Sequence, residues 1–125
     1  MWRQFNPNPD GRRVGDCAVR AVARALNTDW YTAYDLITEE GRRQRDMPSS
    51  NAVWGTVLRT HGFRRYAVPT SCPDCYTAED FAADHPTGIY VLGFGTHVAT
   101  VIDGVLYDSW DSSGEAPQYY WYRED

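Results

Sequence analysis

The feature that most constrains the fold is a change in the spacing of apolar residues along the chain. Early in the sequence they recur three and four positions apart, the spacing of an amphipathic helix; the first such set is Val19, Val22, Ala23 and Leu26. From Ile89 onward the period is two, as in β-strands. Asp103-Gly104 lies between two strand-like runs, 97–102 and 105–110, and predicts a two-residue hairpin turn. Helices followed by an antiparallel meander predict an α+β domain.

Boundary signals place four helices in the sequence. The first is expected after Asp16 as N-cap and before Asn27 as stop, and the second from Thr28 to Gly41. The third is expected between Ser50 and Gly62. A fourth, short helix opens with the capping-box pattern at residues 77–80 and stops before Pro86. Further strands are expected at residues 63–68, 89–94 and 119–122.

The length of 125 residues corresponds to one domain, spanning 1–125. Residues 1–15 are expected to form an irregular lead-in, because 6–15 are rich in Asn, Pro and Gly, and residues 41–48 to form a solvated loop. At this size the hydrophobic core is large enough to fold without a metal or a disulfide. No cofactor is expected.

Charge and hydropathy exclude several functional classes. The formal net charge of −5 disfavours nucleic-acid binding, which needs a basic face. No apolar run approaches the ~20 residues of a membrane helix, and the N-terminal residues lack the apolar stretch of a secretory signal. Three cysteines cannot all pair within one chain, so a disulfide framework is not expected. We therefore expect a cytoplasmic protein.

Cys17 is the first candidate for chemistry, because it stands at the expected start of the first helix. The helix dipole and free N–H groups there favour an anion and so lower the pKa of a thiol toward the nucleophilic thiolate. The alternative is that Cys17 is a small buried residue, the commonest fate of a free cysteine.

The hairpin supplies partners for a nucleophile. If Ile102 faces Val105, then His97 faces Trp110 and Ala99 faces Asp108, all on one face of the ribbon. Asp108 is then the diagonal neighbour of His97 and is close enough to orient its ring. We expect His97 to pair with Cys17, Asp108 to hold the ring, and Trp110 to shield their hydrogen bond from water.

The residues resemble the papain-like cysteine peptidases. Their order is a helix-opening Cys, then His on a strand, then Asn or Asp on the next strand. The segments His97-Val-Ala-Thr-Val and Asp108-Ser-Trp110 look like the papain-type His-Ala-Val and Asn-Ser-Trp segments, with Asp replacing Asn. Gly15-Asp-Cys-Ala-Val-Arg20 also looks like small papain-fold proteins of bacteria and their phages. The resemblance implies a papain-like fold, with N-terminal helices packed on a C-terminal antiparallel sheet.

One part of the family pattern is missing. Papain-like enzymes carry a Gln about six residues before the Cys as oxyanion donor, and Gly11 stands at that spacing here. Asn6 is the preferred substitute, because neighbouring prolines would hold it stiffly; Gln4 and Asn8 are alternatives. The backbone N–H of Cys17 would supply the other donor.

The remaining candidates for chemistry carry weaker signals. Cys72-Pro-Asp-Cys75 has the spacing of half a zinc site or of a redox pair, but no second such motif exists, and an ordinary loop is the preferred interpretation. His61 is expected at a helix C-terminus and His85 in a surface loop.

Two functions follow from these expectations. The first is a papain-like cysteine hydrolase that cleaves a peptide, isopeptide or related amide bond in a peptide or protein substrate, with Cys17 as nucleophile, His97 as acid–base and Asp108 as orienting group. A transferase or deamidase would use the same residues. The second is a binding or inhibitory module of the same fold without catalysis, acting between phage and host.

Overall fold

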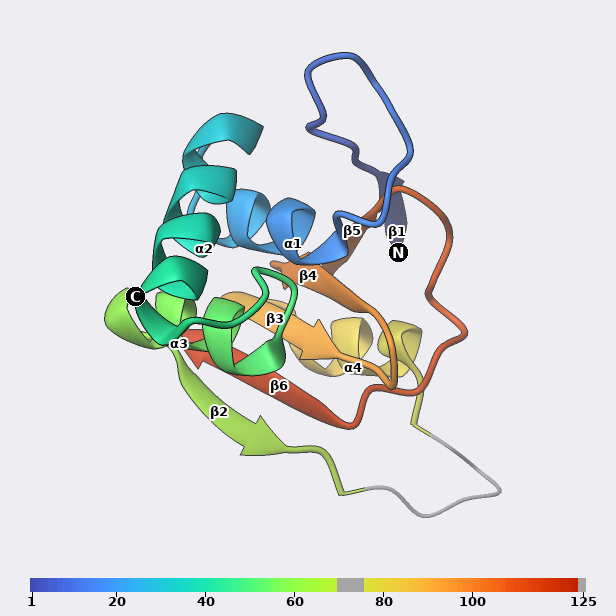
Figure 1. Ribbon diagram of the computed structural model, residues 1–125. Coiled ribbons are helices and arrows are strands. Elements are labelled where there is room, and N and C mark those ends of the chain that lie inside the picture. Colours follow the sequence, from blue (N-terminus) through green and yellow to red (C-terminus); the bar gives the residue numbers. More distant parts are fainter. Residues whose placement is uncertain (70–75, 124–125) are drawn as a thin grey trace.

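The computed structural model describes residues 1–69 and 76–123 as an α+β fold (Figure 1). The helices are α1 (Cys17–Ala25), α2 (Trp30–Gln44), α3 (Asn51–Thr60) and α4 (Ala78–Asp84). The strands are β1 (Trp2–Gln4), β2 (Arg64–Ala67), β3 (Ile89–Gly93), β4 (Val98–Ile102), β5 (Val105–Asp108) and β6 (Tyr119–Arg123). In the described residues the strands form one mixed sheet in the order β1-β5-β4-β3-β6-β2.

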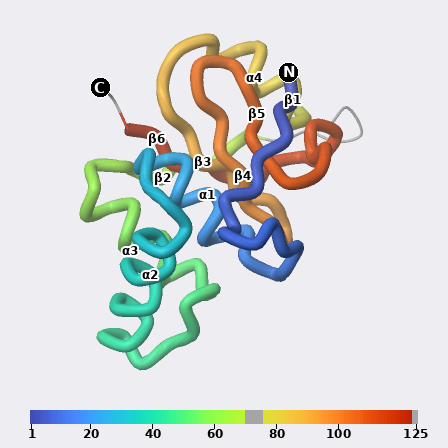
Figure 2. The backbone as a smooth tube through the Cα atoms, turned by 90° about the horizontal axis from the view of Figure 1, so that it is seen from above, coloured from blue at the N-terminus to red at the C-terminus, as the bar shows by residue number. Residues whose placement is uncertain are grey.

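The sheet is covered by helices on both faces (Figure 2). Helices α1, α2 and α3 pack on the face that presents Val91, Val98 and Trp121, whereas α4 packs on the opposite face, against Leu92 and Val101. Alternate residues of β3 therefore serve different cores, as the two-residue period of a strand requires. Helix α1 lies on the face covered by three helices, so the side chains at its N-terminus contact the sheet on that face.

The β4–β5 hairpin has the predicted turn and register. Asp103 and Gly104 both have positive φ, 50° and 80°, as a type I′ turn needs. Ile102 pairs with Val105, and Thr100 pairs with Tyr107. The register that places His97 beside Asp108 is thus confirmed up to the last ladder pair before them.

The sheet differs from the predicted antiparallel one at its edge. Residues Trp2–Gln4, expected within an irregular lead-in, form β1, which pairs in parallel with β5. The backbone N–H of Phe5 donates to the Asp108 carbonyl at 2.8 Å, and that of Leu106 donates to the Met1 carbonyl at 2.8 Å. A strand as short as β1 leaves little periodic signal, and the unpaired edge of β5 accounts for its pairing.

Helix α2 also runs past its predicted end at Gly41, so residues 41–44 are helical rather than part of a loop. The helix ends at Gln44, and Arg45 follows in the left-handed conformation with φ 57°. Gly41 lies inside the last turn, where a Cβ would stand 2.9 Å from the Asp46 carbonyl oxygen. The glycine therefore allows the following chain to fold back on the helix.

The other predicted helix boundaries are confirmed, whereas the hairpin strands are shorter than predicted: β4 begins at Val98 and β5 ends at Asp108, so Trp110 lies beyond the strand. Asn27 follows α1 with φ 54°, Ser50 precedes α3, and Thr77 with Asp80 forms a complete capping box on α4. The aromatic segment 119–122 lies within β6. Among the described residues, no helix is both long enough and apolar enough to cross a membrane.

Candidate active site

Cys17 is the first residue of α1 and lies against the start of β4. Its side chain is partly buried and receives a hydrogen bond from the backbone N–H of Val98. As the first helical residue it has a backbone N–H without an intrahelical acceptor. The sulfur therefore has a backbone donor from the sheet, and the positive end of the helix dipole lies beside it.

His97 and Asp108 come together at the open end of the hairpin. His97 precedes β4, Asp108 ends β5, and the distance between His97 Nε2 and Asp108 Oδ2 is 2.5 Å. The same histidine is hydrogen-bonded to Cys17. Because Nε2 is occupied by the carboxylate, Nδ1 is the ring nitrogen that remains for the sulfur. The structure thus brings the three predicted residues into one hydrogen-bonded chain.

The pKa values favour an ion pair within this chain. Burial alone would raise the pKa of the Cys17 thiol, but the hydrogen bond from His97 and the one from Val98 bring it below its ordinary value. Burial alone would lower the pKa of His97, but its bonds to Asp108 and Cys17 raise it to about 9. Both shifts favour the thiolate–imidazolium form of the pair, which is the reactive form of a catalytic cysteine.

Asp108 is held as a buried carboxylate by several donors. Burial alone would raise its pKa, but His97 and the Ser112 hydroxyl, which donates to Oδ2 at 2.6 Å, lower it. The backbone N–H of Ser109 donates to Oδ1 at 2.7 Å. Arg20 adds a contact between Nη2 and Oδ1 at 3.4 Å. These contacts occupy both oxygens of the carboxylate, so its orientation toward His97 is fixed.

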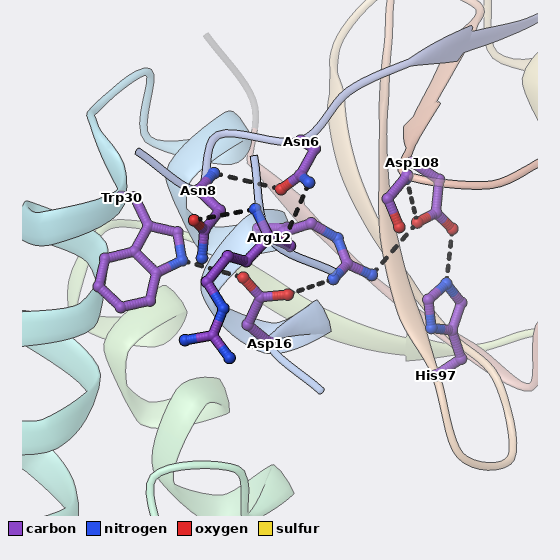
Figure 3. A network of polar contacts seen from close by, with 9 residues as sticks. Asn6, Asn8, Arg12, Asp16, Trp30, His97 and Asp108 are labelled. Carbon is purple, nitrogen blue, oxygen red and sulfur yellow. Dashed lines mark hydrogen bonds and ion pairs between the residues drawn. The ribbon is translucent and has the colours of Figure 1, made fainter. Parts of the chain in front are cut away.

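Arg20 extends this cluster from Asp108 to Asp16, which precedes α1; Asp16 and Asp108 are labelled in Figure 3. Arg20 is 7% exposed and forms an ion pair with Asp16 one helical turn earlier. The other Asp16 oxygen accepts a hydrogen bond from Trp30 Nε1 at 3.0 Å. Asp16 occupies the predicted N-cap position, but its side chain makes no capping bond because Arg20 and Trp30 engage it.

Arg20 and Ser112 also belong to the site, although neither was predicted from the sequence. Four residues separate Asp16 from Arg20, and this i,i+4 spacing of opposite charges was the available signal. Nothing in the sequence distinguishes Ser112 from the neighbouring serines, because its burial depends on how the chain leaves β5.

A pocket of about 630 Å³ opens beside the sulfur. Its walls include Cys17 and His97, the backbone of residues 94–98, and one end of α1, α2 and α3. Five aromatic side chains contribute to it: Trp30, Tyr34, Trp54, Phe94 and Tyr119. The nucleophile therefore faces a largely apolar space that can receive an acyl group or a peptide side chain.

Trp110 and Asn6 differ in how they relate to the site. The Trp110 ring lies 5.0 Å from the His97 ring between centroids, as predicted, but it is 43% exposed and so shields one side only. Asn6 does not line the pocket. Its amide donates to the Arg12 carbonyl at 3.1 Å, and its Oδ1 accepts from the backbone of Asn8 (Figure 3). Asn6 stabilises the lead-in loop and is not an oxyanion donor in this structure.

The other candidate residues lie away from Cys17. His61 caps α3 as predicted and contacts the Val57 carbonyl through Nδ1. His85 caps α4 and stacks on Phe81, so it is not a free loop residue. Within residues 1–69 and 76–123, no group of three or more His, Cys, Asp or Glu is arranged to hold a metal. The Cys72–Cys75 motif falls outside the described residues.

Comparisons of the chain with protein-family models, with curated proteins and with solved structures give no match. The interpretation of the site therefore rests on its own geometry.

Proposed function

We propose that this protein is a papain-like cysteine hydrolase that cleaves a peptide, isopeptide or related amide bond. The observation that carries the proposal is the chain of hydrogen bonds from Cys17 through His97 to Asp108 at the wall of a pocket. Cys17 comes from the start of α1, and His97 and Asp108 come from the β4–β5 hairpin far along the chain. The order of the three groups, thiol, imidazole and carboxylate, is the one that thiol catalysis uses.

The reaction starts from the ion pair. The Cys17 thiolate attacks the amide carbonyl carbon, an S–C bond forms, and the carbonyl π electrons move to oxygen. When they return, the C–N bond breaks and protonated His97 gives its proton to the leaving amine. Water then hydrolyses the thioester, with His97 as base. An amine in place of water would make the same site a transferase, and a primary amide as substrate would make it a deamidase.

The fold supports this proposal through the order and roles of its elements. A helix that opens with the nucleophile packs on a sheet in which the histidine immediately precedes one strand and the acid ends the neighbouring strand. In this site Asp108 takes the position of the papain-type Asn, so the carboxylate charge adds to the orientation of the ring. The raised pKa of His97, about 9, fits that extra charge.

The alkylation rate of Cys17 by iodoacetamide, followed by mass spectrometry from pH 5 to 10, tests the proposal. We expect the alkylation rate of Cys17 to reach its maximum well below pH 8.5, which is about the pKa of an ordinary thiol. His97→Ala should move its profile back to that region. The cysteines at 72 and 75 serve as internal references in the same sample. If Cys17 reacts only as an ordinary thiol, the protein is not this hydrolase, and the binding or inhibitory module becomes the better interpretation.

A further inference from the structure

Acyl transfer at Cys17 needs hydrogen-bond donors for the negative oxygen of the tetrahedral intermediate. The backbone N–H of Cys17 is one such donor. The papain-type Gln is absent, since Gly11 stands at its spacing, and Asn6 is occupied in the lead-in loop. The question is which other donor in the pocket can reach the reacting carbonyl.

Tyr119 crosses the sheet toward Cys17. It is the first residue of β6 and pairs with Gly93 on β3. A Cβ built on Gly93 would lie 2.1 Å from Tyr119 Cζ, so the ring occupies the space above that glycine. On its other side Gly93 pairs with Val98, whose N–H donates to the Cys17 sulfur. The phenol therefore extends from β6 across β3 toward β4, whose first residue, Val98, donates to the Cys17 sulfur.

The Tyr119 hydroxyl is available as a donor. Its side chain lines the same pocket as Cys17 and His97, and the residue is 8% exposed. Among the described residues this hydroxyl has no hydrogen-bond partner, and it is not one of the fully buried polar atoms, so a ligand in the pocket can reach it. The guanidinium of Arg65 stands 4.2 Å from the ring centroid and fixes the ring from β2.

The electrostatics keep this phenol protonated. Burial raises the pKa of Tyr119, the charge of Arg65 lowers it, and the nearby charge of Cys17 raises it again, with a net upward shift. An intact O–H is the form that can donate to an oxyanion, and the coupling to Cys17 agrees with the short path across Gly93.

We propose that Tyr119 is a catalytic residue whose hydroxyl donates a hydrogen bond to the oxyanion, opposite the backbone N–H of Cys17. The phenol keeps its proton throughout: it binds the oxygen when the S–C bond forms and releases it when the carbonyl returns. The inference rests on the proposed hydrolase function and identifies the donor that replaces the missing Gln. Gly93 is then required because any side chain there would displace the ring.

Two small probes separate this role from a structural one. The ester 4-nitrophenyl acetate forms an oxyanion when a thiolate attacks it, and the burst of 4-nitrophenolate measures acylation of the enzyme. Iodoacetamide alkylates the same thiolate by displacement of iodide, without an oxyanion. A donor to the oxyanion thus affects only the first reaction, whereas altered packing or an altered thiolate affects both.

The variant is Tyr119→Phe, with Tyr120→Phe as matched control and the rate of Cys17→Ala subtracted. Tyr120 carries the same hydroxyl on the next residue but packs in the other core, with α4. We expect Tyr119→Phe to slow the ester burst at least ~10-fold, a loss smaller than the ~10²–10³-fold cost of losing one donor in an enzyme's own reaction, since 4-nitrophenolate leaves readily. Its iodoacetamide rate should stay within about twofold of wild type, and Tyr120→Phe should leave both rates unchanged.

Each outcome has a separate meaning. A Tyr119→Phe burst within about twofold of wild type overturns the role of Tyr119, and so does an equal loss in both reactions. If wild-type Cys17 is not activated toward iodoacetamide, the hydrolase proposal itself fails, and Tyr119 has no oxyanion to bind. The variant removes an oxygen that has no hydrogen-bond partner in residues 1–69 and 76–123, so its unfolding midpoint should match that of wild type.

Discussion

Replacing Arg20 by methionine tests whether the buried charge cluster stabilises the site. Arg20 is 7% exposed and contacts two carboxylates, Asp16, itself 7% exposed, and Asp108, which is 2% exposed. Methionine preserves most of the aliphatic volume and removes the charge. The substitution therefore leaves both acids in place without the cation between them.

The expected cost follows from what each carboxylate retains. Asp108 keeps His97, Ser109 and Ser112 as donors, whereas the one donor that Asp16 keeps among the described residues is Trp30. Most of the penalty thus falls on Asp16. Breaking a buried ion pair by removing one partner costs ~3–5 kcal/mol, and the lower end applies because Asp108 remains satisfied. A loss of about 3 kcal/mol lowers the midpoint of thermal unfolding by roughly 10 °C for a chain of this size.

Urea denaturation followed by circular dichroism measures this loss, with Arg24→Met as control one turn further along α1. The Arg24 guanidinium lies 4.1 Å from the centroid of the Tyr107 ring and has no carboxylate partner in the described residues. We therefore expect Arg24→Met to lower the free energy of unfolding by about 1 kcal/mol or less. The double variant Asp16→Asn/Arg20→Met should recover more than half of the loss. A loss below about 1 kcal/mol in Arg20→Met, or no recovery in the double variant, would refute the reasoning.

Three further predictions concern pH dependence, the carboxylate and the end of α2. The rate of the ester burst should rise with pH as the Cys17 thiol, whose pKa is lowered, becomes a thiolate. It should fall again near pH 9 as His97 loses its proton. A single rise without an alkaline fall would contradict the ion pair. Ser112→Ala should cost about 2 kcal/mol in urea denaturation, because it removes a buried hydrogen bond to the charged Asp108. Ser113→Ala in the same loop should cost less, because the hydroxyl of this partly buried residue bonds to Asp111, which is exposed. Gly41→Ala should destabilise the protein, because the Cβ of alanine would stand 2.9 Å from the Asp46 carbonyl oxygen. This clash should outweigh the ~1 kcal/mol by which alanine is preferred over glycine in a helix. A stabilised variant would show that the loop at 45–48 moves aside freely.

The elements with strong local signals could be predicted from the sequence. Asp103-Gly104 fixed both the turn and the register, and through them the contact of His97 with Asp108. The capping box at Thr77 and the stop at Asn27 are likewise local devices, readable without a partner.

The parts that depend on distant segments could not be predicted. Strand β1 forms because it pairs with the edge of β5. Gly41 lies inside the last turn of α2 rather than after it, and the Asp46 carbonyl that packs against it belongs to the chain beyond the helix. Asn6 was predicted at the site because neighbouring prolines would hold it stiffly, but its amide is hydrogen-bonded to the Arg12 carbonyl within the lead-in loop. Tyr119 was read only as part of an aromatic strand, since its path across Gly93 exists only when β3 and β6 are paired.

The titration of His97 tests the central claim, a thiolate–imidazolium pair, most directly. The pKa of each histidine can be followed from its ring C–H resonances by NMR, with His97→Gln used to assign the signal. We predict a pKa of about 9 for His97 in wild type and a lower value in Cys17→Ala, still above 6.5 because Asp108 remains. A His97 that titrates near 6.5, with or without the Cys17 sulfur, would contradict it.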